Sequence, residues 1–133
     1  MRRTIICGAA ALVSLASALP AWAQFDGIYN GQVQCGPSGG QRVPVGTVRI
    51  TVAGTGFTYE VQVTGGGVER GTGDVTPPSI SGGGSGSGGG WRYDSSYSGQ
   101  IAPGTILMSG EQTGTFTGGA SGGRQCSMSA RRG

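Results

Sequence analysis

The sequence predicts an all-β fold, a small antiparallel β-barrel or sandwich of about six to eight short strands tied by one disulfide. Three observations predict it. Apolar and polar residues alternate strictly in several segments, whereas no segment has the i, i+3, i+4, i+7 spacing of an amphipathic helix. Glycine is abundant, with 30 in 133 residues, and each glycine inside a helix costs about 1 kcal/mol relative to alanine. Finally, one cysteine lies near each end of the predicted domain.

Residues 1–23 are typical of a secretory signal peptide, with a basic start, an apolar run and the small residues of "AWA" before cleavage after Ala23. A membrane-spanning helix would need about 20 apolar residues, whereas this run is shorter and ends at Pro20. Cys7 lies at the beginning of the run and not at its end, where a lipoprotein would have its cysteine. We therefore expect a periplasmic or secreted protein.

Removing 23 of the 133 residues leaves 110, so residues 24–133 are expected to form a single β domain. Seven arginines and six carboxylates remain, a formal net charge of +1. A surface that follows nucleic-acid phosphates needs a clustered excess of positive charge. The composition therefore predicts no nucleic-acid partner.

The clearest strand pair is a hairpin over residues 48–63 with a four-residue connection at 53–56. One register brings the apolar residues of the two strands together on one face. It pairs Val52 with Phe57, Ile50 with Tyr59, and Val48 with Val61. The same register sets Arg49 opposite Glu60 on the polar face, so we expect these two charges to pair.

Weaker alternation predicts further strands at 91–97, 104–110, 113–118 and 124–129. The tract "SGGGSGSGGG" at 81–90 offers no apolar side chains for a core, and it is predicted to be a mobile Gly/Ser loop. The "TPP" segment before it, Thr76 to Pro78, is expected to block a central strand.

The two cysteines of the exported chain, Cys35 and Cys126, are expected to form a disulfide, because free thiols oxidise outside the cytoplasm. The bridge would tie the first strand to the last and stabilise a domain with little buried apolar area by about 4 to 5 kcal/mol. No metal site is expected, since two thiolates without CxxC spacing and without any histidine do not make a zinc site.

The segment "FDGIYNGQVQC", Phe25 to Cys35, carries a DGxYxGxxxC pattern. In this pattern, and in its second cysteine near the C-terminus, the chain resembles small uncharacterised exported β-proteins of Gram-negative bacteria. The resemblance implies a periplasmic or secreted β-domain of unknown activity and supplies no catalytic residues.

The residue types argue against an enzyme. Histidine and lysine are absent, so neither a Ser-His-Asp triad nor a Schiff-base nucleophile can be built. Carboxylate-pair hydrolysis remains open through Asp26, Glu60, Glu69, Asp74, Asp94 and Glu111, although turn and solvent-facing roles explain these residues better. "GSGSGG" at 84–89 matches GxGxxG only because the tract is glycine-serine, and no helix follows it. We expect no cofactor.

An outer-membrane barrel is the structural alternative. It needs about eight strands of roughly ten residues with an apolar outer belt. A glycine-rich chain of 110 residues is not expected to supply these, so no stable membrane insertion of the exported chain is predicted.

The functional expectation is a non-enzymatic β-module of unknown binding role, with an envelope protein or a glycan as partner. The alternative is a protein inhibitor of an envelope or host hydrolase. The candidate binding residues are Trp91, Tyr93 and Tyr97, which follow the glycine tract and share one strand face. Either these rings belong to the core, or Trp91 is partly exposed and stacks on a sugar or anchors a partner.

Overall fold

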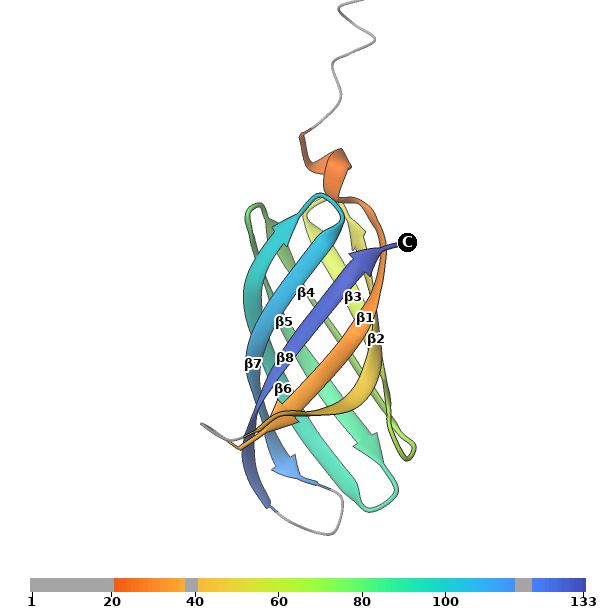
Figure 1. Ribbon diagram of the computed structural model, residues 1–133, viewed down its shortest axis with the longest axis vertical. Coiled ribbons are helices and arrows are strands. Elements are labelled where there is room, and N and C mark those ends of the chain that lie inside the picture. Colours follow the sequence, from red (N-terminus) through yellow and green to blue (C-terminus); the bar gives the residue numbers. More distant parts are fainter. Residues whose placement is uncertain (1–20, 38–40, 117–120) are drawn as a thin grey trace, which may run out of the picture.

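The computed structural model describes residues 21–37, 41–116 and 121–133, which form one closed antiparallel barrel of eight strands (Figure 1). Each strand pairs with its neighbour in sequence, and β1 pairs with β8 to close the sheet. The elements are η1 (Ala21–Phe25), β1 (Gly27–Gly36), β2 (Val43–Ala53), β3 (Gly56–Val63), β4 (Val68–Thr76), β5 (Ser79–Gly88), β6 (Trp91–Ala102), β7 (Thr105–Thr115) and β8 (Ser121–Arg132). The all-β prediction is confirmed, and the fold is a barrel and not a sandwich.

The predicted hairpin is confirmed in its register. Across β2 and β3, Val48 lies opposite Val61, Ile50 opposite Tyr59, and Val52 opposite Phe57, and all six side chains are buried. Arg49 lies opposite Glu60, but the ion pair of Glu60 is formed with Arg70 of β4, at 2.8 Å between Nε and Oε2. The predicted ion pair between Arg49 and Glu60 is therefore wrong. Glu60 pairs with Arg70 because β4 supplies a second arginine on the same outer face.

The prediction of a mobile Gly/Ser loop at 81–90 is wrong. Residues Ser79–Gly88 form β5, and only Gly89 and Gly90 make the turn to β6. The glycines at 82, 84, 86 and 88 lie on the inward parity and the serines at 81, 85 and 87 on the outward parity. The rings of Phe57, Tyr93 and Trp91 pack against Gly82, Gly86 and Gly88, and Gly84 lies against the backbone of β4, so the tract packs without apolar side chains of its own.

The segment at 113–118 was predicted as a separate strand centred on Phe116, and this is also wrong. Thr113 to Thr115 are the last residues of β7, Phe116 follows the strand directly, and residues 117–118 lie outside the described part of the chain. The other three predicted strands correspond to parts of β6, β7 and β8, with Gly104 alone lying in the turn before β7. In the "TPP" segment, Thr76 ends β4 and the two prolines form the turn to β5, so the prolines lie between two strands and not inside one.

The disulfide between Cys35 and Cys126 is confirmed, with an S–S distance of 2.07 Å. The two residues lie directly opposite each other in the β1–β8 ladder, so the bridge joins the two strands that close the barrel.

The end of the barrel that carries η1 is here called the helix end, and the opposite end, where β6 begins, the tryptophan end (Figure 1). Phe25 of η1 is buried, and its carbonyl accepts a 2.7 Å hydrogen bond from the Tyr29 hydroxyl. Asp26 accepts a 2.9 Å hydrogen bond from the amide of Gly54 in the β2–β3 turn. Gly27 has a φ of +138°, which favours glycine. These residues of the DGxYxGxxxC pattern thus attach η1 to the helix end.

Residues 1–20 of the predicted signal peptide lie outside the described residues, so cleavage after Ala23 stays a prediction. In the described part of the chain, no helix is long and apolar enough to cross a membrane.

The strands contain 8 to 12 residues each, so the expectation that this chain lacks eight strands of roughly ten residues is wrong. Their outward positions are mostly Ser, Thr, Gln and charged residues. Among the described side chains, the exposed large apolar ones are Ile28, Val43 and Leu107.

Candidate functional site

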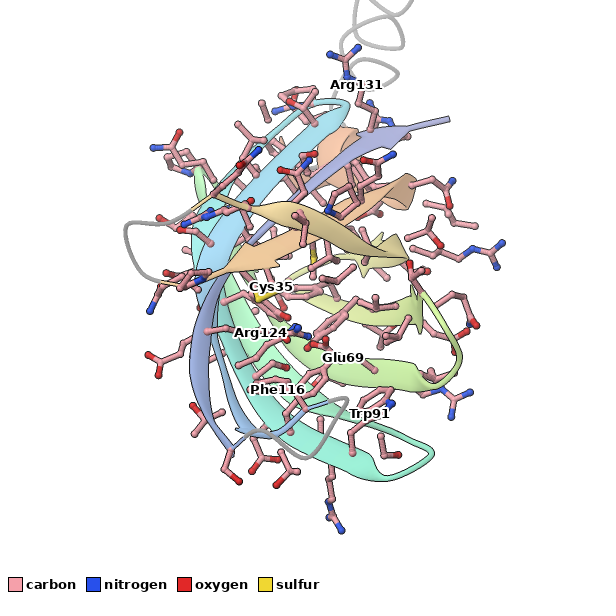
Figure 2. All side chains as sticks on the ribbon, turned by 60° about the horizontal axis from the view of Figure 1, so that its bottom comes forward. Cys35, Glu69, Trp91, Phe116, Arg124 and Arg131 are labelled. Carbon is pink, nitrogen blue, oxygen red and sulfur yellow. A yellow bond between two sulfur atoms is a disulfide. The ribbon has the colours of Figure 1, made fainter. Side chains whose placement is uncertain are left out.

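A buried carboxylate, Glu69, lies inside the barrel toward the tryptophan end (Figure 2). Its neighbours in β4, Val68 and Arg70, are more exposed, and Glu69 has the inward parity because it pairs with the buried Val61 of β3. An unpaired buried charge would cost several kcal/mol, so its hydrogen bonds decide whether it is tolerated.

Glu69 is surrounded by hydrogen-bond donors. Oε1 accepts from the Tyr93 hydroxyl at 2.8 Å, and from the Tyr97 hydroxyl and Gln112 Nε2 at 3.2 Å each. Oε2 accepts from Tyr59 and Ser95 at 2.6 Å each, and from Tyr97 at 3.0 Å. Five side chains therefore satisfy one carboxylate, and none of the buried side-chain nitrogen or oxygen atoms in the described residues lacks a partner.

Glycines on β4 and β5 make this arrangement possible. One row of paired inward positions runs from Glu69 through Gly86 to Tyr93, so the Tyr93 ring crosses the bare backbone of Gly86 and its hydroxyl reaches Glu69. A Cβ at Gly86 would lie 2.6 Å from Tyr93 Cζ.

The neighbouring inward row runs Tyr59, Gly71, Gly84, Ser95, Gln112, Arg124. Here the Tyr59 ring covers Gly71, and its hydroxyl lies 2.9 Å from Ser95 Oγ.

The pKa values of Tyr59, Tyr93 and Tyr97 are all raised well above that of an ordinary tyrosine. Burial is the largest cause, and the adjacent charge of Glu69 is the second. All three hydroxyls thus stay protonated at neutral pH and act as donors to the carboxylate, not as bases or nucleophiles.

A second layer lies between this network and the tryptophan end. Arg124 Nε donates a 2.7 Å hydrogen bond to Gln112 Oε1. The guanidinium carbon lies 4.3 Å from the ring centroid of Phe116 and 5.6 Å from that of Tyr93, within the range of cation–π contacts. Trp91 stacks on Tyr93, with ring centroids 5.5 Å apart and an interplanar angle of 11°. Figure 2 shows Trp91, Phe116, Arg124 and Glu69 within the barrel outline at this end.

The three candidate binding residues are all in the barrel interior. Trp91 is 9% exposed, and Tyr93 and Tyr97 are exposed by 3% and 2%. The Trp91 ring packs against positions 67 and 88, where a Cβ would collide with it. The core alternative therefore describes these rings, and the exposed Trp91 required for surface stacking is not observed.

Sequence reasoning missed Glu69, Gln112, Phe116 and Arg124 as members of this cluster. The available signal was strand parity, since Arg124 lies two residues before the inward Cys126, and Gln112 and Phe116 share one parity of the same segment. Charged and amide side chains on an alternating pattern usually face water. Only closure of the barrel shows that these ones meet.

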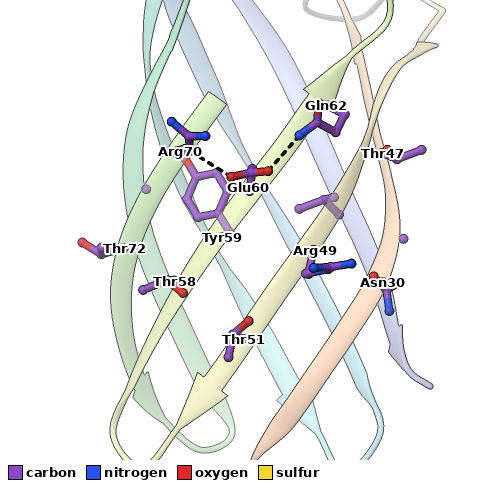
Figure 3. A pocket seen from close by; sticks show the side chains of 13 residues that line it. Asn30, Thr47, Arg49, Thr51, Thr58, Tyr59, Glu60, Gln62, Arg70 and Thr72 are labelled. Carbon is purple, nitrogen blue, oxygen red and sulfur yellow. Dashed lines mark hydrogen bonds and ion pairs between the residues drawn. The ribbon is translucent and has the colours of Figure 1, made fainter. Parts of the chain in front are cut away.

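A groove with a volume of about 880 Å³ lies on the outer surface of β1 to β4 (Figure 3). Its charged residues are Arg49, Glu60 and Arg70. Glu60 accepts 2.8 Å hydrogen bonds from Arg70 Nε and from Gln62 Nε2. The hydrogen bond from Arg70 is the main reason that the pKa of Glu60 is below its ordinary value.

Three threonines line up in the same groove. Thr51, Thr58 and Thr72 are directly opposed across β2, β3 and β4, and all three are exposed. The groove therefore presents a row of three hydroxyl groups beside two guanidinium groups and one carboxylate.

Two of the six candidate carboxylates, Glu69 and Glu60, are already engaged by protein donors. A general base needs a free lone pair near substrate, whereas Glu69 accepts from five protein donors, and Glu60 is held by Arg70 and Gln62. Within the described residues, no group of three or more His, Cys, Asp or Glu side chains is placed to hold a metal ion. The chain matches no protein-family model, no curated protein sequence and no solved structure.

Proposed function

We propose that this protein is a non-enzymatic exported binding module that uses the outer groove of β1 to β4 to engage an envelope protein or glycan. The Cys35–Cys126 disulfide supports residence in an oxidising compartment, the periplasm or the exterior. The polar outward positions support a barrel that faces water and not lipid acyl chains.

The observation that carries the proposal is the groove itself. Eight-stranded barrels either fill their interior with side chains or leave room for one small ligand. Here buried side chains from all eight strands fill the centre, so recognition of a macromolecule falls to the outside. The groove has room for part of a partner, its lining residues lie on hydrogen-bonded strands, and they include both hydrogen-bond donors and acceptors.

Charge gives the groove its selectivity. Arg70 is engaged by Glu60, whereas Arg49 makes no side-chain hydrogen bond to any described residue. Arg49 also helps to lower the pKa of Glu60 through its charge, so it lies within electrostatic reach of the ion pair. This surface fits a partner that presents a hydrogen-bond acceptor or a negative group to Arg49. The same partner would form hydrogen bonds with the hydroxyl groups of the three threonines.

A pull-down from envelope extract tests the proposal. Immobilised wild type is compared with Arg49→Glu/Thr58→Arg, which changes the groove, and with Arg92→Glu/Ser109→Arg, which makes the same change in net charge on the outer face of β6 and β7. We expect the groove variant to lose a ligand that the control variant keeps. If both variants retain the same material as wild type, or if only the control loses it, the assignment of the groove is wrong.

The same experiment addresses the inhibitor alternative. A retained hydrolase whose activity falls on addition of wild type, but not of the groove variant, identifies an inhibitor. Retained polysaccharide identifies a glycan-binding module.

A further inference from the structure

The guanidinium group of Arg124 is held in place on two sides. Gln112 Oε1 accepts from Nε, and the Phe116 ring lies under the guanidinium plane. Gln112 is itself fully buried, and its Nε2 donates to Glu69 at 3.2 Å and to the Tyr97 hydroxyl at 2.9 Å. The orientation of Arg124 is therefore set by an amide that cannot rotate without breaking the Glu69 network.

The unused donors of Arg124 are on its two terminal nitrogens. A guanidinium has five N–H donors, and the Gln112 contact uses the one on Nε. Among the described residues, neither Nη1 nor Nη2 makes a hydrogen bond, and Arg124 is half-buried. One N–H group on each of these two nitrogens points in the same direction, and together they form a fork that can bind both oxygens of a carboxylate.

The charge of Arg124 has no direct counter-ion in the described structure. The nearest carboxylate along the network is Glu69, which lies behind Gln112 and already accepts from five donors. The only salt bridge found within residues 21–37, 41–116 and 121–133 joins Glu60 and Arg70 on the outside. The terminal nitrogens of Arg124 are accessible to solvent, since no buried side-chain nitrogen in the described residues lacks a partner, and the partial burial of the guanidinium beside Tyr93 and Phe116 strengthens its attraction for an anion.

We propose that Arg124 forms an anion-binding site at the tryptophan end, for a small organic carboxylate with an apolar body. The fork would hold the carboxylate and the partly exposed Phe116 ring would contact the apolar part, while Trp91, stacked on the adjacent Tyr93, would report the binding. This site lies at the tryptophan end of the barrel and is separate from the outer groove. A test of the site is therefore independent of the proposed function.

Cyclohexanecarboxylate is the probe, because it joins a carboxylate to an apolar ring and does not absorb where tryptophan does. The full chain carries Trp22→Phe, so that Trp91 is the only tryptophan. We expect a saturable change in Trp91 emission on titration with the probe at constant ionic strength. Cyclohexanemethanol, which has the ring without the charge, should give none.

Variants assign the site. Arg124→Gln should weaken binding at least tenfold, Arg124→Lys should weaken it less because the charge remains without the fork, and Arg131→Gln on the outer face of β8 should bind as wild type. If Arg124→Gln binds like wild type, or if the neutral probe or added sulfate gives the same emission change, the proposal is wrong.

A direct measurement covers the case in which Arg124 variants do not fold. In ¹⁵N-labelled wild type, the Arg124 Nε–Hε signal should shift saturably with cyclohexanecarboxylate. An Arg124 Nε–Hε signal that stays unchanged at the highest probe concentration would overturn the proposal.

Discussion

At the scale of single residues, Glu69 organises the tryptophan end because its carboxylate is the common acceptor for side chains from β3, β6 and β7. The donors cannot easily find other partners, since they are buried with it. A buried carboxylate stabilises such a network only while every donor is matched to an oxygen lone pair. The network is therefore sensitive to a change of a single atom.

Glu69→Gln makes that change. The new NH₂ group would face hydroxyl donors in place of an acceptor, so we expect the free energy of unfolding to fall by about 2 to 4 kcal/mol. Glu111→Gln is the matched control, since Glu111 is exposed and is expected to change stability by less than about 0.5 kcal/mol. Urea unfolding of both variants measures the difference. Equal effects would mean that Glu69 is not the centre of the network.

The buried tyrosines make stability depend on high pH. Because folding raises the pKa of Tyr59, Tyr93 and Tyr97, the folded chain keeps protons that the unfolded chain loses above pH ~10. Their contribution is fully present below that pH and is lost as the pH rises, by about 1.4 kcal/mol per pH unit for each tyrosine. Tyrosinate absorbance and circular dichroism, recorded together, should show these three residues ionising only as the barrel unfolds. Ionisation of all tyrosines near pH 10 with the fold intact would contradict this.

At the scale of elements, β5 is a strand whose inward side is almost bare. Gly82, Gly86 and Gly88 leave the space that the rings of Phe57, Tyr93 and Trp91 occupy, and Gly84 lies against the backbone of β4. The apolar content of this part of the core thus comes from β3 and β6 and not from the glycines of β5.

Gly86→Ala should be costly for this reason. The added methyl would meet Tyr93 at Cζ and at its hydroxyl, which is held 2.8 Å from Glu69. We expect a loss of about 2 kcal/mol or more, whereas Ser85→Ala on the outward parity should change stability by less than about 0.5 kcal/mol. Thermal unfolding of the two variants provides the measurement. Adding Tyr93→Leu to Gly86→Ala should cost less than the sum of the single changes, and strict additivity would show that the two residues do not touch.

The hairpin and β5 show what the sequence could and could not predict. Val48, Ile50, Phe57 and Tyr59 carry their own burial signal, so alternation alone gives the correct register. In β5 the inward residues have no side chain, and a count of apolar residues gives no signal. Ser81, Ser85 and Ser87 share the outward parity, but a tract of serine and glycine offers no apolar face from which a strand can be predicted.

The interior site was harder to predict than the fold. Trp91, Tyr93 and Tyr97 share one parity in the sequence, and they do lie together inside. Glu69 and Arg124 are 55 positions apart in the chain, and their inward orientation depends on pairings that only the closed barrel supplies. Their charges also favoured a solvent-facing prediction.

At the scale of the whole molecule, closure of the sheet removes every exposed strand edge. The pairing of β1 with β8 and the disulfide between them fix the closing seam, and η1 attaches to the helix end through Asp26 and Tyr29. All eight strands should therefore gain their protection from solvent together, including the glycine-rich one.

Hydrogen–deuterium exchange followed by NMR tests this closed barrel most directly. Amides of β5 between Ser81 and Ser87 are paired with both β4 and β6, so they should exchange as slowly as those of the β2–β3 hairpin, within about tenfold. The turn glycines Gly89 and Gly90 should exchange fast and serve as the internal control. Fast exchange across residues 81–88, with β2 and β3 still protected, would show that the tract is a loop and that the barrel is not closed.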